Sequence, residues 1–80
     1  MDSVRVAVLQ MVSGDDLDHN LTQAEALLRR AAAEGAELVL LPEYFYLMPV
    51  DERARVALAA PVEDHPLLAW ARKLARELGV

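Results

Sequence analysis

A short apolar run that ends in a proline and a carboxylate constrains the fold of this chain more than any other feature. Residues 38–41 are Leu-Val-Leu-Leu, and Pro42 and Glu43 follow directly. Four uniformly apolar residues are too few for an amphipathic helix, so they predict a buried strand. Pro42 ends this strand, because proline has no amide hydrogen to donate to a neighbouring strand. We therefore expect Glu43 just beyond the carboxyl end of a strand, where open α/β sheets usually bind their ligands.

The residues before this run predict a strand followed by a helix. Residues 4–11 are rich in β-branched side chains and only Arg5 and Gln10 are polar, which is typical of a strand covered on both faces. Between residues 17 and 34, apolar side chains recur at spacings of three and four and predict a helix with one apolar face. These side chains belong to Leu17, Leu21, Ala24, Leu28 and Ala31. Gly35 suits the left-handed position that commonly follows a helix, and the order strand-helix-strand predicts two parallel strands.

Two further helices are expected after the apolar run. Residues 51–60 predict a short helix. Asp64 or His65 is expected to cap a later helix. Pro66 then takes the favoured first-turn position of that helix, and Gly79 ends it. The predicted order for the whole chain is strand-helix-strand-helix-helix.

The composition suggests that this small α/β unit does not cover its own sheet. Its apolar fraction, 55%, lies above the roughly 45–50% that is usual for soluble domains. Two parallel strands and three helices would leave the faces and the edges of the sheet poorly covered. We therefore expect residues 1–80 to be a piece of a larger sheet, or a chain that must assemble with partners.

Charge, hydropathy and cysteine content exclude several classes of function. The net charge is −5 and the basic residues are scattered, so no patch for a nucleic-acid backbone is expected. No apolar run approaches the roughly 18 residues that span a bilayer, and the amino terminus lacks the pattern of a secretory signal. These features predict a cytoplasmic protein that binds neither nucleic acid nor membranes. The chain has no cysteine, which excludes disulfides, thiolate metal sites and a cysteine nucleophile within these residues.

Five segments, taken in order, carry a resemblance to a known family. They are Leu9-Gln10-Met11 at the end of the first strand, the helix opening that contains Asn20, the turn Gly35-Ala36-Glu37, the signature Leu41-Pro42-Glu43, and the late run Ala75-Arg76-Glu77-Leu78-Gly79-Val80. Together they resemble the start of the carbon-nitrogen hydrolase family, the nitrilase and amidase superfamily. The resemblance covers nearly the whole chain. Tyr44 follows the signature where some branches of the family have asparagine, so the subfamily stays open.

The resemblance implies both a fold and a reaction. The fold is a four-layer αββα sandwich, of which residues 1–80 would supply the amino-terminal portion. The reaction is hydrolysis of a non-peptide amide or nitrile carbon–nitrogen bond by a Glu, a Lys and a Cys, without metal or cofactor. Glu43 matches the glutamate that acts as general base. The family's lysine and cysteine lie downstream of it, and Lys73, the one lysine here, is not a match.

The same resemblance implies how the intact protein behaves. It would be a hydrolase that acts on a small-molecule amide or nitrile and forms homo-oligomers. The eighty residues alone would be inactive, because they lack the nucleophile.

Other side chains around Glu43 allow two interpretations each. Tyr44 and Phe45 are candidates for a substrate pocket, and core packing is the alternative for at least one of them. The acids before the first long helix, together with His19, suggest a metal site at first sight. Acids at a helix amino terminus are more often capping residues that interact with the helix dipole, and we expect that role here. They are Asp15, Asp16 and Asp18.

Two functions of other classes remain open at this point. A phosphoacceptor receiver domain also has acids after its first strand, but it needs an aspartate at the strand end where this chain has Pro42. A non-catalytic interaction module would use the strand-helix-strand unit to pair with another chain.

Overall fold

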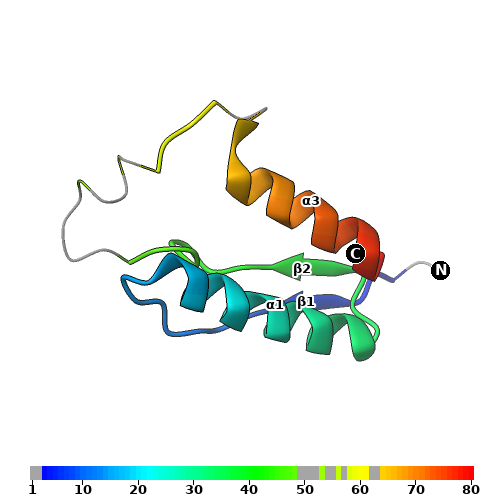
Figure 1. The fold of residues 1–80 in the computed structure, drawn as a ribbon. Helices are drawn as coiled ribbons and strands as arrows, with labels where there is room; N and C mark the ends of the chain where they lie inside the picture. The colour runs from blue at the N-terminus through cyan, green and yellow to red at the C-terminus, as the bar shows by residue number, and fades with distance from the viewer. Residues whose placement is uncertain (1–2, 49–52, 54–55, 57, 62–63) are drawn as a thin grey trace.

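Two parallel strands and two helices make up the described part of the chain (Figure 1): β1 (Val6–Val8), α1 (Leu17–Ala33), β2 (Leu38–Leu40) and α3 (Pro66–Leu78). This computed structural model describes residues 3–48, 53, 56, 58–61 and 64–80. The predicted strand-helix-strand order is confirmed, and so is the parallel pairing of the strands. Half of the residues of the helix predicted over residues 51–60 lie outside the described residues.

The two strands pair over a shorter length than predicted. The paired residues are Val6 with Leu38, Ala7 with Val39, and Val8 with Leu40. At the far end of the pair, the amide of Leu9 still donates to the carbonyl of Leu40 at 3.0 Å. The predictions of strands over residues 4–11 and 38–41 were too long, because a strand extends only as far as its partner. Pro42 ends β2 and leaves the residues after Leu9 without a partner in that strand.

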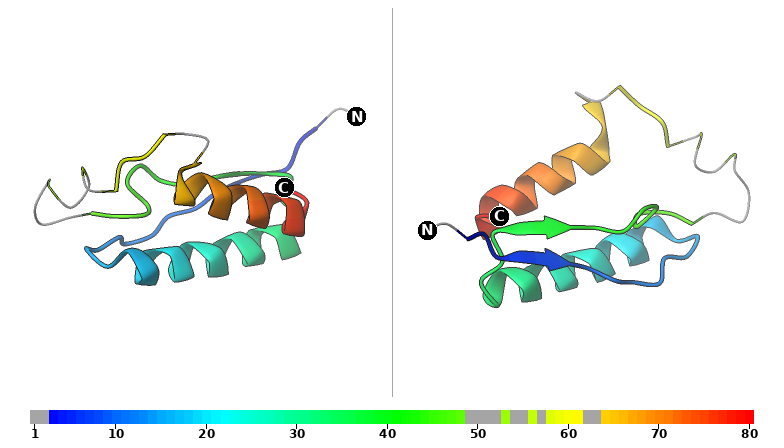
Figure 2. Two further views of the ribbon diagram at one scale, coloured as in Figure 1. Left: turned by 45° about the horizontal axis from the view of Figure 1, so that its top comes forward. Right: turned by 180° about the vertical axis from the view of Figure 1, so that it is seen from behind.

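Both helices lie on one face of the sheet, as the two views in Figure 2 show. The core lies between this face and the helices and consists of Leu9, Leu28, Ala31, Ala36 and Leu74. The opposite face is apolar and open, with Val8 72% exposed and Leu40 60% exposed. The prediction that both strands are covered on both faces is therefore wrong for the described residues. The expectation of a poorly covered sheet is confirmed.

The two ends of α1 are stabilised by hydrogen bonds that its sequence predicts. At the start, a carboxylate oxygen of Asp16 accepts from the amide of His19 at 3.1 Å. At the end, Gly35 has a φ of 92° and its amide donates to the carbonyl of Ala32. The amide of the next residue donates to Ala31, and the two bonds together form a Schellman motif.

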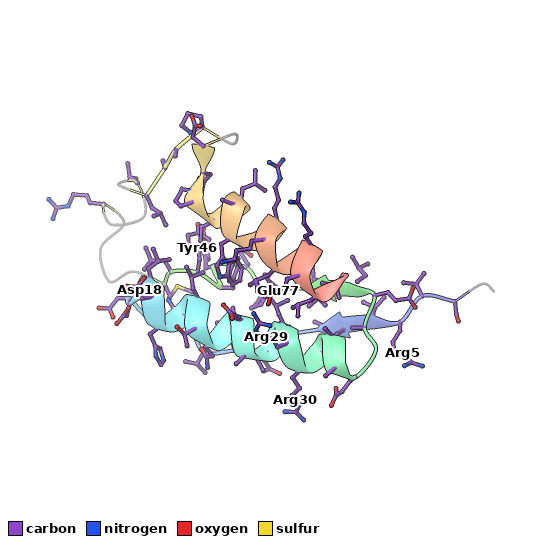
Figure 3. All side chains as sticks on the ribbon, turned by 45° about the vertical axis from the view of Figure 1, so that its right-hand side comes forward. Arg5, Asp18, Arg29, Arg30, Tyr46 and Glu77 are labelled. Carbon is purple, nitrogen blue, oxygen red and sulfur yellow. The ribbon has the colours of Figure 1, made fainter. Side chains whose placement is uncertain are left out.

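The second helix, α3, begins and ends as predicted and packs against α1. His65 is the residue that caps it, through a hydrogen bond from the amide of Leu67 to Nδ1, and Gly79 ends it with a φ of 72°. Between the helices, the guanidinium of Arg29 donates to the carboxylate of Glu77 at 3.0 Å (Figure 3). Both side chains are exposed, so this ion pair is screened by solvent and the apolar contact through Leu74 holds the helices together.

Among the described residues, neither helix has the length and the apolar content needed to cross a membrane.

The turn at Gly35 provides a test of this fold. Gly35→Ala should lower the free energy of unfolding of the natural gene product by about 1–2 kcal/mol, because a side chain disfavours the left-handed conformation. Gly14→Ala is the matched control, since Gly14 has no positive φ and an added Cβ would meet nothing within 4 Å. Chemical denaturation should show a change of less than about 0.5 kcal/mol for the control. Equal losses for both variants would contradict the assigned turn.

Candidate active site

The candidate catalytic residue, Glu43, lies on a tight turn shortly after the carboxyl end of β2. The amide of Phe45 donates to the carbonyl of Pro42 at 3.2 Å and closes this turn around Glu43 and Tyr44. Glu43 is exposed to solvent. The location predicted for it, beyond the end of the strand, is the one that the structure shows. A carboxylate in this place can accept a proton from a group that approaches from solvent.

Tyr44 has an unusual backbone conformation. Its φ is 56°, and it is the one non-glycine residue with a positive φ among the described residues. A left-handed residue at the third position of a turn is the requirement of a type II turn, which normally places glycine or asparagine there. A tyrosine in this conformation costs on the order of 1–3 kcal/mol, so contacts elsewhere must hold the turn.

Hydrogen bonds from the loop after β1 and from the start of α1 hold one side of this turn. The hydroxyl of Ser13 donates to the carbonyl of Phe45 at 2.8 Å, and the side-chain amide of Asn20 donates to the carbonyl of Tyr46 at 2.9 Å. In the reverse direction, the amide of Met48 donates to the carbonyl of Gly14 at 2.8 Å. The two loops lie side by side at the carboxyl ends of the strands (Figure 1).

The roles of Ser13 and Asn20 were not predicted from the sequence, in which Asn20 belongs only to the segments that resemble the family. A signal for it exists, because Asn20 lies four residues before Ala24 and therefore on the buried face of α1. A polar side chain on that face needs hydrogen-bond partners inside the protein.

Aromatic contacts with α3 hold the other side of the turn. The ring of Phe45 stacks on Trp70 with centroids 5.8 Å apart and meets the ring of Tyr46 edge-to-face at 5.5 Å. Such pairs stabilise by about 0.5–1.5 kcal/mol beyond the area that they bury. Trp70 therefore contacts the loop that carries Glu43.

A shallow cavity of about 320 Å³ lies beside the turn. It is lined by Tyr44, Tyr46, Leu58, Ala59 and His65. Of the two residues proposed for a substrate pocket, Tyr44 lines this cavity and Phe45 packs against Trp70 instead. The role of both in binding a substrate stays a prediction.

One of the three acids at the start of α1 is a helix-capping residue. The structure shows Asp16 capping α1, as expected, and Asp18 lies in its first turn. Among the described residues, no three His, Cys, Asp or Glu side chains gather closely enough to hold a metal ion. Lys73 is exposed on α3, and the sequence has no cysteine, so the eighty residues supply no thiol nucleophile beside Glu43.

Comparison with known proteins identifies the family. A sequence model described as carbon-nitrogen hydrolase matches residues 5–80, which is nearly the entire chain. The chain belongs to the carbon-nitrogen hydrolase family. This membership argues against a phosphoacceptor receiver domain, which was one of the alternatives.

Several enzymes of this family are similar to the chain. N-carbamoylputrescine amidase of Arabidopsis thaliana is 39% identical over 80 residues, which are 96% of this chain and 27% of that protein. Deaminated glutathione amidase of Bos taurus is 37% identical over 94% of this chain and 23% of that protein. Citrullinase of Francisella tularensis is 28% identical over all of this chain and 29% of that protein. The chain therefore spans between a quarter and a third of two of these relatives and slightly less of the other.

Tyr44 allows a test of the turn geometry. Tyr44→Asn should keep the stability of the natural gene product within about 0.5 kcal/mol of that of Tyr44→Gly, because asparagine tolerates a positive φ. Tyr44→Val should be less stable than Tyr44→Asn by about 1–2 kcal/mol, since a β-branched side chain is the least compatible with this conformation. All three variants lose the aromatic ring, so thermal or denaturant unfolding isolates the backbone effect. Equal stability of the valine and asparagine variants would show that Tyr44 is not left-handed.

Proposed function

We propose that the natural protein hydrolyses a non-peptide carbon–nitrogen bond of a small-molecule amide, with Glu43 as general base. The observation that carries this proposal is the location of Glu43 on a turn at the carboxyl end of β2. Ser13 in the loop after β1, Asn20 in α1 and Trp70 in α3 hold this turn in place. General acid–base catalysis needs a carboxylate held in one place relative to the reacting atoms. Membership in a family of carbon-nitrogen hydrolases supports the reaction class.

The proposed mechanism uses a thiol and an ammonium group in addition to Glu43. Glu43 takes the proton of a cysteine thiol, and the thiolate attacks the carbonyl carbon of the amide. The lysine stabilises the charge that develops on the carbonyl oxygen. Glu43 then delivers the proton to the leaving nitrogen, the carbon–nitrogen bond breaks, and a thioester remains. Glu43 then takes a proton from water, and the resulting hydroxide attacks the thioester carbon. The carbon–sulfur bond breaks, Glu43 returns its proton to the departing thiolate, and the acid is released.

The cysteine and lysine of this mechanism have no counterpart in the eighty residues. The sequence contains no cysteine, and Lys73 is exposed on α3. We propose that both groups come from a part of the natural protein outside residues 1–80, and that the eighty residues by themselves are inactive. No metal or cofactor is required in this mechanism.

The finer structural expectations belong to the same proposal. In a four-layer αββα sandwich, a second sheet would cover the open face that contains Val8 and Leu40. We also propose that the natural protein forms homo-oligomers and is located in the cytoplasm.

The open apolar face also favours a second candidate function. Val6, Val8, Leu38 and Leu40 are each more than half exposed and lie together on one face of the sheet. A face of this kind is suited to pairing with another chain. The interaction module therefore remains the alternative if the natural protein proves to lack a nucleophile.

The role of Glu43 can be tested in the natural gene product. Glu43→Gln should lower kcat for ammonia release by about 10² to 10⁴ and leave KM within about threefold, because only proton transfer is removed. N-carbamoylputrescine and simple primary amides are the first substrates to measure, since the Arabidopsis relative is named for the former.

A control for this experiment is Glu34→Gln. Glu34 is an exposed carboxylate at the other end of α1, where it pairs with Arg30. Its replacement should leave kcat unchanged. Retention of more than a third of the wild-type kcat by Glu43→Gln would refute Glu43 as the general base.

A further inference from the structure

We propose that Asn20 is a positioning residue that holds the turn of Glu43 in its catalytic geometry. This inference rests on the proposed function, in which Glu43 is the general base. The hydrogen bonds of the Asn20 side chain go to Gly14 and Tyr46 and not to Glu43. This side chain acts on the backbone that follows Glu43.

Asn20 is fully buried, which is uncommon for a polar side chain. Its exposed fraction is 0%, and it is the one buried polar residue among those described. Every part of its carboxamide has a partner. Oδ1 accepts from the amide of Gly14 at 3.0 Å, and Nδ2 donates to the carbonyls of Gly14 and Tyr46, each at 2.9 Å. A buried carboxamide whose oxygen and both amide hydrogens have partners holds those partners in a fixed arrangement.

The partners of Asn20 belong to two different loops. Gly14 lies in the loop between β1 and α1, and Tyr46 lies in the loop after β2. The carbonyl of Gly14 also accepts from the amide of Met48, so each of the two loops donates a hydrogen bond or accepts one across their contact. The start of α1 and the loop after β2 lie side by side in both views of Figure 2. Figure 3 labels Tyr46 near the start of α1.

The turn needs such an anchor because it is strained. Tyr44 is left-handed, and a turn without a positive φ would be favoured if the flanking residues were free to move. The carbonyls of Phe45 and Tyr46 follow the strained residue directly and are the ones that Ser13 and Asn20 hold. Release of these carbonyls would let the turn relax and would displace Glu43 without changing its chemistry.

The first experiment is a double-mutant cycle in the natural gene product. Asn20→Asp keeps the size of the side chain but replaces the Nδ2 donor by an oxygen that repels the carbonyl of Tyr46. We expect kcat to fall roughly 10- to 100-fold with KM within about threefold. In a Glu43→Gln background the same substitution should lower kcat by less than threefold, because the base that it positions is gone.

The control is Gln23→Met, a loss of a carboxamide one turn further along α1. The Oε1 of Gln23 is buried and has no hydrogen-bond partner among the described residues. This variant should leave kcat unchanged. Ser13→Ala is a second test variant, because it frees the carbonyl of Phe45 and leaves Asn20 in place. It should lower kcat about 2- to 10-fold, again only when Glu43 is present.

The outcomes separate this inference from the proposed function. Equal losses from Asn20→Asp with and without Glu43 would mean that Asn20 has a merely structural role and would overturn the inference. An unchanged kcat in Asn20→Asp would overturn it too. If Asn20→Asp fails to fold, Ser13→Ala decides the question by the same comparison. A full kcat in Glu43→Gln alone would overturn the proposed function, and this inference with it.

Discussion

The parallel pairing of β1 with β2 is the constraint on which the rest of the structure depends. Because the strands run in the same direction, their carboxyl ends lie at the same edge of the sheet. The loops that follow them therefore meet, although they are far apart in the sequence. The turn with Glu43 belongs to the second loop, and the side chains that hold it by hydrogen bonds belong to the first loop and to the start of α1. Parallel pairing thus creates the candidate site.

The same pairing explains why both helices lie on one face of the sheet. The helix between parallel strands must cross one face of the sheet, and α3 packs beside it on that face through Leu74. The other face keeps its apolar side chains exposed, which is unusual for a folded unit in water. In the proposed sandwich, that face becomes an interior layer. The site and the open face are therefore two consequences of one topology.

Local features of the structure were predictable from the sequence, and contacts between distant segments were not. The periodicity of the apolar residues and the position of Gly35 predicted α1 to within one residue of its end. Pro42 predicted the end of β2, and hence the location of Glu43. The strands were predicted to be covered on both faces because Val-Ala-Val and Leu-Val-Leu are apolar at every position. Such runs do not show which face is covered.

The anchors of the turn depend on geometry that a sequence pattern does not contain. Asn20 and Tyr46 are 26 residues apart, and their hydrogen bond forms only because the strands pair in one register. The stacking of Phe45 on Trp70 depends in the same way on where α3 packs. The left-handed conformation of Tyr44 could not be predicted from the sequence either, since tyrosine rarely adopts it.

The central claim is that Glu43 moves protons while a thiol forms the covalent bond. Peptide mapping by mass spectrometry, after acid quenching of the natural protein during turnover of an amide, tests this claim most directly. The account predicts an acyl group on a cysteine, which must lie outside residues 1–80, and an unmodified Glu43. An acyl group on Glu43 itself would make the carboxylate the nucleophile and would contradict the account.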